Sequence, residues 1–549
     1  MSIYSTGVTA LQAAQASIAT TGHNIANVNT DGYRRQEVVL ATNTAVKTGS
    51  GYIGQGVNVT TVRRVYSEFL ERQVIQSESR AAYLDQYQTA IQQIDSVLGD
   101  RSAGFAGAIQ KFFAAWQNLS GNPASGPARQ GVLGAANVVA NSINSMGDYL
   151  QSLQESVNRE ISSLVAQVNS YASNIADMNT RIAAIQNSQL QPPNDLLDQR
   201  DQLVSQLNEL VGVTVVKDAT TGDYNLFMGR GFQLVVGGES NAISASSSQY
   251  DPLRTEVYAA GDVVQISGKS VIAGRLGALL DYREETLDVT QNELGRIAIA
   301  MTESVNALHA SGVDLNGGTG NNFFASLTAS PLALASTNNA GTAVLTATIN
   351  NAGQLTASDY SLTFDGATFT LTRQSDGQSW SDPDVAVLSG LAAQGFALSI
   401  SVAPNAGDSF LIRPTVVAAN NASVAISDTA LIAAASGTAL PGDTLDNQTA
   451  LAITALQRDI TLIAGNNTLE SSYTSLVHRV GSKAEEVETN LRAQSNLLDQ
   501  AVQAQQSASG VNLDEEAANL IRYQQAYQAA AQLFKTANNM FDTLLALGG

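Results

Sequence analysis

The chain has 549 residues, which suggests several domains, and 44% of them are hydrophobic while only 14% are charged. A formal net charge of −20 argues against nucleic acid or anionic lipid as a partner. With three histidines and no cysteine, the composition excludes disulfides and thiol catalysis and leaves little for a soft-metal site.

The N-terminal segment, residues 1–36, is predicted to begin with a coiled-coil-like helix. Large apolar residues recur every seven positions, and a smaller residue follows each of them by three. The large residues are Tyr4, Leu11, Ile18 and Ile25, and the smaller ones are Gly7, Ala14, Thr21 and Val28. No Lys or Arg precedes Arg34, so we expect no cleavable secretory signal. No run in the chain reaches the roughly 18 apolar residues that span a bilayer, so we expect no membrane insertion.

The stretch HNIANVNTDGYRRQ, residues 23–36, is predicted to be an elbow. Asn27, Asn29, Asp31 and Gly32 are residue types that end helices and tolerate left-handed backbone. An extended connector over 37–66 follows. The sequence leaves open whether Arg34 and Arg35 also contact a neighbouring subunit.

Residues 67–212 are predicted to form a helical domain. Apolar residues at three and four spacing predict helices over 67–98, 105–120 and 128–188, and a shorter one that ends at Gly212. GNPASGP at 121–127 and QPPND at 191–195 are breaks between them.

In the middle of the chain, the spacing of apolar residues changes from that of helices to that of strands. Short β-rich pieces predict a small β excursion over 213–274, and 275–312 returns to helix. Alternating runs bounded by Asp-Gly and Asn-Ala-Gly turns predict an outer β domain over 338–420. We expect irregular connections on both sides of it. One long helix of the helical domain is then expected over 448–509.

The last segment, 510–549, repeats the heptad pattern of the first. Its seven-spaced apolar residues are Leu513, Leu520, Tyr527, Phe534 and Phe541, and the residues four positions later are Ala517, Gln524, Ala531, Asn538 and Leu545. Such spacing is also typical of an ordinary buried helix. Because both ends of the chain require a helical partner, we predict that they pair with each other. The predicted fold class is multidomain α+β, with terminal coiled-coil-like helices, a long helical bundle and inserted β-rich domains of sandwich or barrel type.

Two motifs resemble ligand-binding sites, but the residues around them do not fit such sites. GSGYIG at 49–54 matches a dinucleotide fingerprint but is followed by an alternating, β-branched run, where that fold needs a helix. DLNGGTGNNFFA at 314–325 begins like a calcium loop but ends on Ala325, where the loop needs a bidentate glutamate. The histidines are far apart, and the carboxylate pairs lack partners. We therefore predict no catalytic, cofactor or metal site.

Both ends of the chain resemble bacterial flagellar axial proteins, the rod, hook and hook-associated proteins. ALQAAQASIATTGHNIANVNTDGYRRQ at 10–36 is similar to their N-terminal signature, and VNLDEEAANLIRYQQAYQAAAQLF at 511–534 to their C-terminal one. Within that superfamily, four stretches resemble the hook-associated protein 1 family: GYRRQ at 32–36, GQGVNVTTVRRVYSEFLERQ at 54–73, LLDQRDQLVSQLNELVGV at 196–213 and the β run at 355–377. A hook or distal rod protein is the alternative, and the long helical region argues against the hook subunit.

The resemblance implies a structural subunit without enzymatic activity. It implies secretion by flagellar type III export, a place at the hook–filament junction of the extracellular flagellum, and no cofactor. The implied partners are copies of the chain in a tubular assembly, the hook protein, a second hook-associated protein, and an export chaperone on the C-terminal helix. In the implied inner tube, Leu11, Ile18 and Ile25 pack with Leu520, Tyr527 and Phe534. A secreted enzyme with a β-domain active site is the rival from another class, but the β segments show no motif for it.

Overall fold

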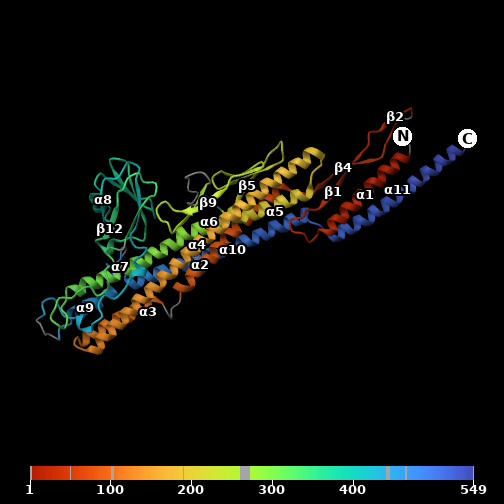
Figure 1. The fold of residues 1–549 in the computed structure, drawn as a ribbon. Coiled ribbons are helices and arrows are strands. Elements are labelled where there is room, and N and C mark those ends of the chain that lie inside the picture. The colour runs from red at the N-terminus through yellow and green to blue at the C-terminus, as the bar shows by residue number, and fades with distance from the viewer. Residues whose placement is uncertain are drawn as a thin grey trace.

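The computed structural model describes residues 3–49, 51–99, 104–189, 191–259, 273–329, 331–439, 445–463 and 466–547. The molecule is elongated (Figure 1): two terminal helices lie side by side at one end, a helical bundle forms the body, and a β domain stands beside the bundle towards the other end. This arrangement confirms the predicted multidomain α+β class. None of the helices within the described ranges combines the length and the apolar character that crossing a membrane needs.

The body is a bundle of long and short helices. They are α2 (Glu68–Leu98), α3 (Phe105–Gly121), α4 (Gly126–Gln189), α5 (Asn194–Val211), α6 (Gly274–Tyr282), the π-helix η1 (Arg283–Leu287), α7 (Asp288–Ala310), α9 (Gln448–Ala455) and α10 (Leu469–Ser509). Proline and glycine set several ends: Pro192 and Pro193 separate α4 from α5, and Gly212 closes α5 with a left-handed φ of 58°.

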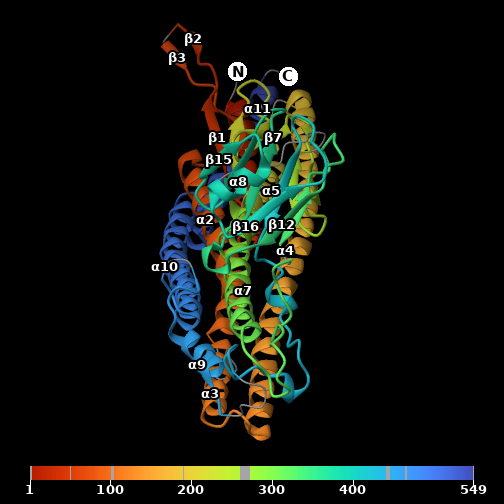
Figure 2. The same cartoon turned by 90° about the vertical axis from the view of Figure 1, so that its left-hand side faces the viewer.

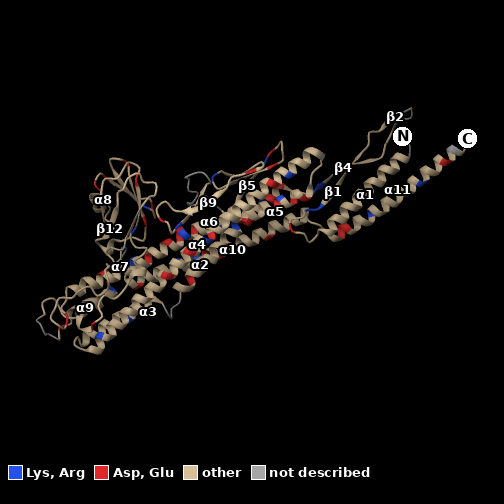
Figure 3. Ribbon diagram, in the orientation of Figure 1, with Lys and Arg blue, Asp and Glu red and all other residues tan. Residues whose placement is uncertain are grey.

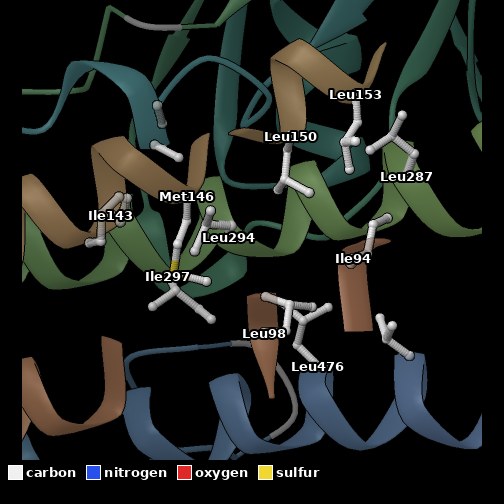
Figure 4. Packing of buried hydrophobic residues seen from close by; sticks show 14 of the residues in the cluster. Ile94, Leu98, Ile143, Met146, Leu150, Leu153, Leu287, Leu294, Ile297 and Leu476 are labelled. Carbon is white, nitrogen blue, oxygen red and sulfur yellow. The ribbon is translucent and has the colours of Figure 1, made fainter. Parts of the chain in front are cut away.

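The bundle core is apolar and closely packed. Figure 4 shows Met146 of α4 against Leu294 of α7, and Leu98 of α2 against Leu476 of α10. These four side chains are all buried. Since they come from segments far apart in the sequence, the core joins the N-terminal and C-terminal halves of the chain.

The single helix expected over 448–509 is wrong, because α9 and α10 are separate helices. After α9, a short 3-10 helix η5 (Leu456–Arg458) ends at Asp459, whose carboxylate accepts a hydrogen bond of 2.8 Å from the Thr461 N–H. Asn466 adopts a left-handed φ of 59°. The Thr468 hydroxyl then caps α10 by accepting from the Ser471 N–H at 3.1 Å. Asp459 and Thr468 interrupt the helix here through local side-chain hydrogen bonds, and Asn466 does so through its left-handed backbone.

The small β excursion forms two antiparallel units. One is a four-stranded sheet in chain order, made of β5 (Val213–Lys217), β6 (Tyr224–Met228), β7 (Phe232–Val236) and β8 (Glu239–Ser240). The other is the hairpin of β9 (Ile243–Ser247) and β10 (Thr255–Ala259). Both contact α4. The rest of the predicted excursion, residues 260–272, lies outside the described residues.

The outer β domain begins earlier than expected. Its strands and one helix are β11 (Leu332–Ala335), β12 (Leu345–Ile349), β13 (Tyr360–Phe364), β14 (Phe369–Arg373), β15 (Ser379–Asp382), α8 (Val385–Ala392), β16 (Phe396–Ile400) and β17 (Ser409–Arg413). The main sheet has the order β11-β17-β13-β14-β15, and β12 pairs with β16. The expected start at 338 was wrong because β11, in a stretch of uncharged residues, is stabilised by pairing with β17.

The connector after the elbow is a long β-hairpin. Strands β1 (Gln36–Thr42) and β4 (Val57–Arg64) pair antiparallel with a bulge after Val39, and β2 (Val46–Thr48) and β3 (Gly51–Ile53) form the tip. Figure 2 shows this tip at the same end of the molecule as both termini. The connector therefore runs back alongside the terminal helices.

Candidate assembly interface

The two terminal helices, α1 (Ile3–Ala26) and α11 (Leu513–Leu547), pack against each other. Their pairing is antiparallel. Near one end the Asn24 amide donates a hydrogen bond of 3.1 Å to the Glu516 carboxylate, and near the other the Tyr4 and Phe534 rings lie 4.6 Å apart. Figure 3 shows α1 almost free of charged residues, whereas α11 begins with a group of acidic ones beside the elbow.

Small side chains close the contact between the helices. On α1, Gly7, Ala14 and Thr21 are buried, and on α11, Ala530 and Ala537 are buried. A Cβ atom on Gly7 would lie 3.5 Å from the Phe534 backbone, which shows how near the two helices come. The smaller residues of the predicted heptad therefore lie at the centre of this contact.

The large heptad residues lie at the edges of the contact. Tyr4 is 46% exposed, Leu513 50%, Tyr527 42% and Phe541 63%. The other large heptad residues, each partly buried, are Leu11, Ile18, Ile25, Leu520 and Phe534. The pair alone thus leaves much apolar surface of both helices open to solvent.

The predicted spacing of four on the last helix was wrong. Ala517, Gln524 and Asn538 are exposed and Ala531 is partly buried, while the Leu545 side chain lies outside the described part. The covered positions instead follow the large residues by three: Glu516, Ala530 and Ala537 are buried and Tyr523 is partly buried. This gives the alternating four and three spacing of a coiled-coil seam.

The elbow follows the end of α1 at Ala26. The Asn27 side chain donates to the His23 carbonyl at 3.0 Å, and the Thr30 N–H donates to the Asn27 carbonyl at 2.9 Å. Gly32 has a φ of 77°, and a Cβ there would lie 2.7 Å from the Gln202 amide oxygen. Only glycine fits that position without strain.

Among the predicted elbow residues, Gly32 alone has left-handed backbone. Asn27, Asn29 and Asp31 all keep negative φ. Asn27 ends the helix through its side chain, as described above, and Asn29 and Asp31 are exposed. The turn therefore depends on one glycine and one asparagine side chain.

Asn24, which the sequence analysis missed, joins three segments at the elbow. Its amide oxygen accepts from the Gln36 N–H at 2.9 Å and from the Tyr33 hydroxyl at 2.8 Å. Its amide nitrogen donates to the Gln36 carbonyl at 2.9 Å and to Glu516. Asn24 is 1% exposed; three of these hydrogen bonds are buried, and the one from Tyr33 is partly buried. The only local signal was a polar residue one position before the heptad residue Ile25.

A buried network of ion pairs fixes the connector to the bundle. The Arg34 guanidinium lies 2.5 Å from the Glu71 carboxylate of α2. The Arg64 guanidinium bonds Asp198 at 2.7 Å and Asp201 at 2.6 Å, both on α5. Burial raises the pKa of the Asp198 carboxyl, and its bonds to Arg64 oppose that shift. Arg34 thus has a role within the chain, in holding the connector against α2.

Arg35 ties the same connector to the C-terminal helices. Its N–H donates to the Ser509 carbonyl at the end of α10 at 2.9 Å, and its guanidinium lies 2.8 Å from Glu515 of α11. Gln505 of α10 also donates to Glu71 at 2.7 Å. The elbow is therefore held by α2, α5, α10 and α11 together.

Comparison with known proteins supports the family resemblance noted in the sequence, and the matches extend over the whole chain. The chain is 38% identical to flagellar hook-associated protein 1 of Salmonella typhimurium and 36% identical to that of Escherichia coli, with 99% of both chains covered in each case. It belongs to the flagellar hook-associated protein 1 family. It is thus a structural protein of the bacterial flagellum, and its family builds the hook–filament junction.

Separate family models match the two terminal segments, part of the bundle and the outer β domain. "Flagellar hook-associated protein FlgK helical domain" matches residues 91–324, and "Flagellar hook-associated protein 1, D2-like domain" matches 334–414. The models "Flagella basal body rod protein" and "Flagellar basal body rod FlgEFG protein C-terminal" match 5–34 and 502–547, which hold the paired terminal helices. The solved flagellar hook junction protein FlgK from Burkholderia pseudomallei matches with a TM-score of 0.72 at 28% identity, over 79% of this chain and 99% of that one.

The remaining motifs have structural roles in this family member. Gly51 to Ile53, within the former dinucleotide match, form β3. The Asp314 carboxylate accepts N–H groups of its own loop, from Asn316 at 2.8 Å and from Gly318 at 2.9 Å. His309 is buried, and its Nε2 accepts from the Ala433 N–H at 2.9 Å. Over the ranges that the structure describes, no three His, Asp or Glu side chains converge as metal ligands.

Proposed function

We propose that the chain is a subunit of the hook–filament junction that is exported by the flagellar type III system and assembles at the distal end of the hook. Its partners there are copies of itself, the hook protein and a second hook-associated protein. The family and the half-exposed heptad residues of α1 and α11 support this proposal.

The exposed heptad residues carry the argument for assembly through the terminal helices. Burying one large apolar side chain contributes about 1.5 to 3 kcal/mol. In the single chain, Tyr4, Leu513, Tyr527 and Phe541 gain only part of this. Contiguous exposed apolar surface of this kind marks a protein interface. A tube of neighbouring terminal pairs would cover it, with the bundle outside the tube and the outer β domain at the surface.

A motility assay tests the proposal. A strain that lacks the chain is expected to build hooks, release unpolymerised flagellin into the medium and fail to swim. Normal filaments in that strain would contradict the assignment to the hook–filament junction. Tyr527→Asn and Phe541→Asn are then expected to fold as the parent but not to restore swimming, because they remove large apolar side chains that α1 does not cover. Gln524→Asn, an exposed neighbour on the same helix, is the matched control and should restore it.

Limited proteolysis tests the coupling between assembly and order. In the purified monomer we expect cleavage within residues 1–40 and 510–549, because two helices that lack their neighbours are marginally stable. In assembled junctions the same sites should be protected. Full protection of both ends in the monomer would show that the pair is complete without neighbours.

The same exposed surface suggests how the chain is held before export. We propose that a flagellar export chaperone binds α11, whose apolar residues have no partner helix until the chain is folded outside the cell. Deletion of 510–549 should abolish chaperone binding, whereas deletion of 1–36 should preserve it. Binding that survives the first deletion would rule out α11 as the chaperone site.

A further inference from the structure

The tip of the connector hairpin, residues 44–55, stands apart from the helices (Figure 2). Asn43 and Gly56 close it, because the Asn43 N–H donates to the Gly56 carbonyl at 3.0 Å. At Gly56 the hairpin still touches α1, since a Cβ atom there would lie 2.6 Å from the Thr9 hydroxyl. A two-stranded hairpin alone in water is only marginally stable, so we expect the hairpin tip to gain order from a partner surface.

Both faces of the hairpin tip carry exposed side chains suited to a protein contact. Val46 pairs with Ile53 and Lys47 with Tyr52 across the two strands, so each pair shares one face. Val46 is 44% exposed, Ile53 56% and Tyr52 73%. Lys47 is the sole charged residue in the stretch 43–56. The hairpin tip is thus apolar on one face and presents an aromatic ring and a single positive charge on the other.

A pocket of about 470 Å³ lies at the other end of α1, between the elbow, α4 and α5. Met178 of α4 and Leu203 of α5 give this elbow pocket apolar lining. Asp31 of the elbow and Asp195 and Asp198 of α5 add three carboxylates. The elbow pocket therefore combines the apolar and acidic groups that complement the hairpin tip.

Two of the three carboxylates leave the elbow pocket negative. Asp198 is paired with Arg64 at 2.7 Å, but neither Asp31 nor Asp195 is paired with a Lys or Arg within the described part of the chain. Burial, and after it the charges of Asp195 and Asp198, raise the pKa of the Tyr33 hydroxyl, which lines the same pocket. The field there favours a positive side chain from outside.

The hairpin tip of a chain cannot reach the elbow pocket of that chain. The hairpin leaves the elbow at Gln36 and runs back along α1 to Thr9, and about 26 Å of helix separates Thr9 from Ala26. The occupant of the pocket is therefore part of another molecule. Copies with a net charge of −20 repel one another, so a contact between copies gains from joining a lone lysine to an acidic pocket.

We propose that the hairpin tip of one copy docks in the elbow pocket of a second copy. Lys47 lies against Asp31 and Asp195, and apolar side chains of the tip pack on Met178 and Leu203. Because tip and pocket are different surfaces, the contact is head-to-tail and can be repeated around or along a tube. It rests on the proposed assembly of the chain into a junction, and it adds a second pair of surfaces to the terminal helices.

Cross-linking in flagella tests the contact in the full chain, in a strain whose swimming the chain restores. Because the chain has no cysteine, Ala45→Cys in the tip and Ala26→Cys beside the pocket give two unique sites at exposed alanines. A flexible bismaleimide should join copies of the double variant into dimers and larger products. Each single variant should give no such products, because tip meets pocket. A link within one chain is excluded by the length of α1 between the two sites.

Charge reversal identifies the surfaces that meet. In the double-cysteine chain, Lys47→Glu should lose the cross-linked products, and adding Asp31→Lys should restore them. Lys217→Glu makes the same change of charge at an exposed residue of β5, and it should leave the products unchanged.

The results separate this contact from the junction role. Swimming cells of the double variant without cross-linked products overturn the contact and leave the junction role intact. Products that persist in Lys47→Glu, or stay lost after Asp31→Lys is added, also overturn it. If the two cysteines themselves stop swimming, parental swimming of a cysteine-free Lys47→Glu chain overturns the contact, and recovery of impaired swimming by Asp31→Lys supports it.

Discussion

Arg34→Met is expected to loosen the elbow far more than Arg35→Met. The Arg34 and Glu71 side chains are 10% and 11% exposed, so removal of the cation leaves a buried carboxylate without its ion partner. Breaking a buried pair in this way costs about 3 to 5 kcal/mol. Since Glu71 keeps the hydrogen bond from Gln505, we expect about 3 kcal/mol. The Arg35–Glu515 pair is 22% and 57% exposed and should contribute only about 0 to 1 kcal/mol.

Hydrogen exchange at the Gln36 amide measures this difference locally. That N–H donates to Asn24 and becomes free only when the elbow opens. A loss of about 3 kcal/mol accelerates its exchange by roughly a hundredfold, whereas Arg35→Met should change it by less than about tenfold. A local probe is needed because a chain of several domains does not unfold in two states. Equal acceleration in the two variants would refute the claim that the buried Arg34 pair holds the elbow.

Three further perturbations test other parts of the structure. Gly295→Ala should lower the thermal stability of the chain by about 1 to 3 kcal/mol or more, because its Cβ would overlap the Thr415 carbonyl; an unchanged melting temperature would contradict that close approach. Burial raises the pKa of Glu78 from 4.5 to about 7. Its contribution to the free energy of unfolding is therefore fully present below pH 4.5 and is lost as the pH rises through 7, a change of about 3 kcal/mol. Glu78→Gln should therefore raise the melting temperature at pH 8 but not at pH 4. Burial lowers the pKa of His309 below 6.5, so its contribution to the free energy of unfolding is fully present above pH 6.5 and falls as the pH drops below that value. His309→Gln should weaken this acid dependence. Melting curves recorded between pH 5 and pH 8 test it.

The helices were predictable where proline, glycine and spacing agree. The run over 128–188 is bounded by Pro127 and by Pro192 and Pro193, and the observed α4 extends it by only two residues and one residue at its ends. Such signals are local, so a single sequence contains them. The unexpected break between α9 and α10 was also local, but its Asp, Asn and Thr signals fall between two strongly helical runs and were read as part of one helix.

What could not be predicted depends on partners far away in the sequence. β11 is a strand because β17 pairs with it, although its own residues alternate between Leu and Ala, which are not strong strand formers. Asn24 and Glu516 meet across most of the chain, and Arg34 finds Asp198 and Glu71 on two other helices. Each of these contacts forms only in the folded chain, and the residues adjacent to each partner in the sequence do not indicate it.

The terminal pair shows why one heptad gave both a correct expectation of pairing and a wrong spacing. In a single helix, positions three and four after a large residue both lie on its face, so the sequence of α11 alone cannot separate them. The contact with α1 decides between them: Gly7, Ala14 and Thr21 are buried on α1, and the buried residues of α11 lie three positions after the large ones, at Glu516, Ala530 and Ala537. The large residues are then displaced to both edges of the contact. Small residues fill the contact between the two helices, and the large apolar residues at its edges stay exposed for packing against other subunits. This is the physical basis for proposing that the terminal helices complete their burial only in the assembled junction.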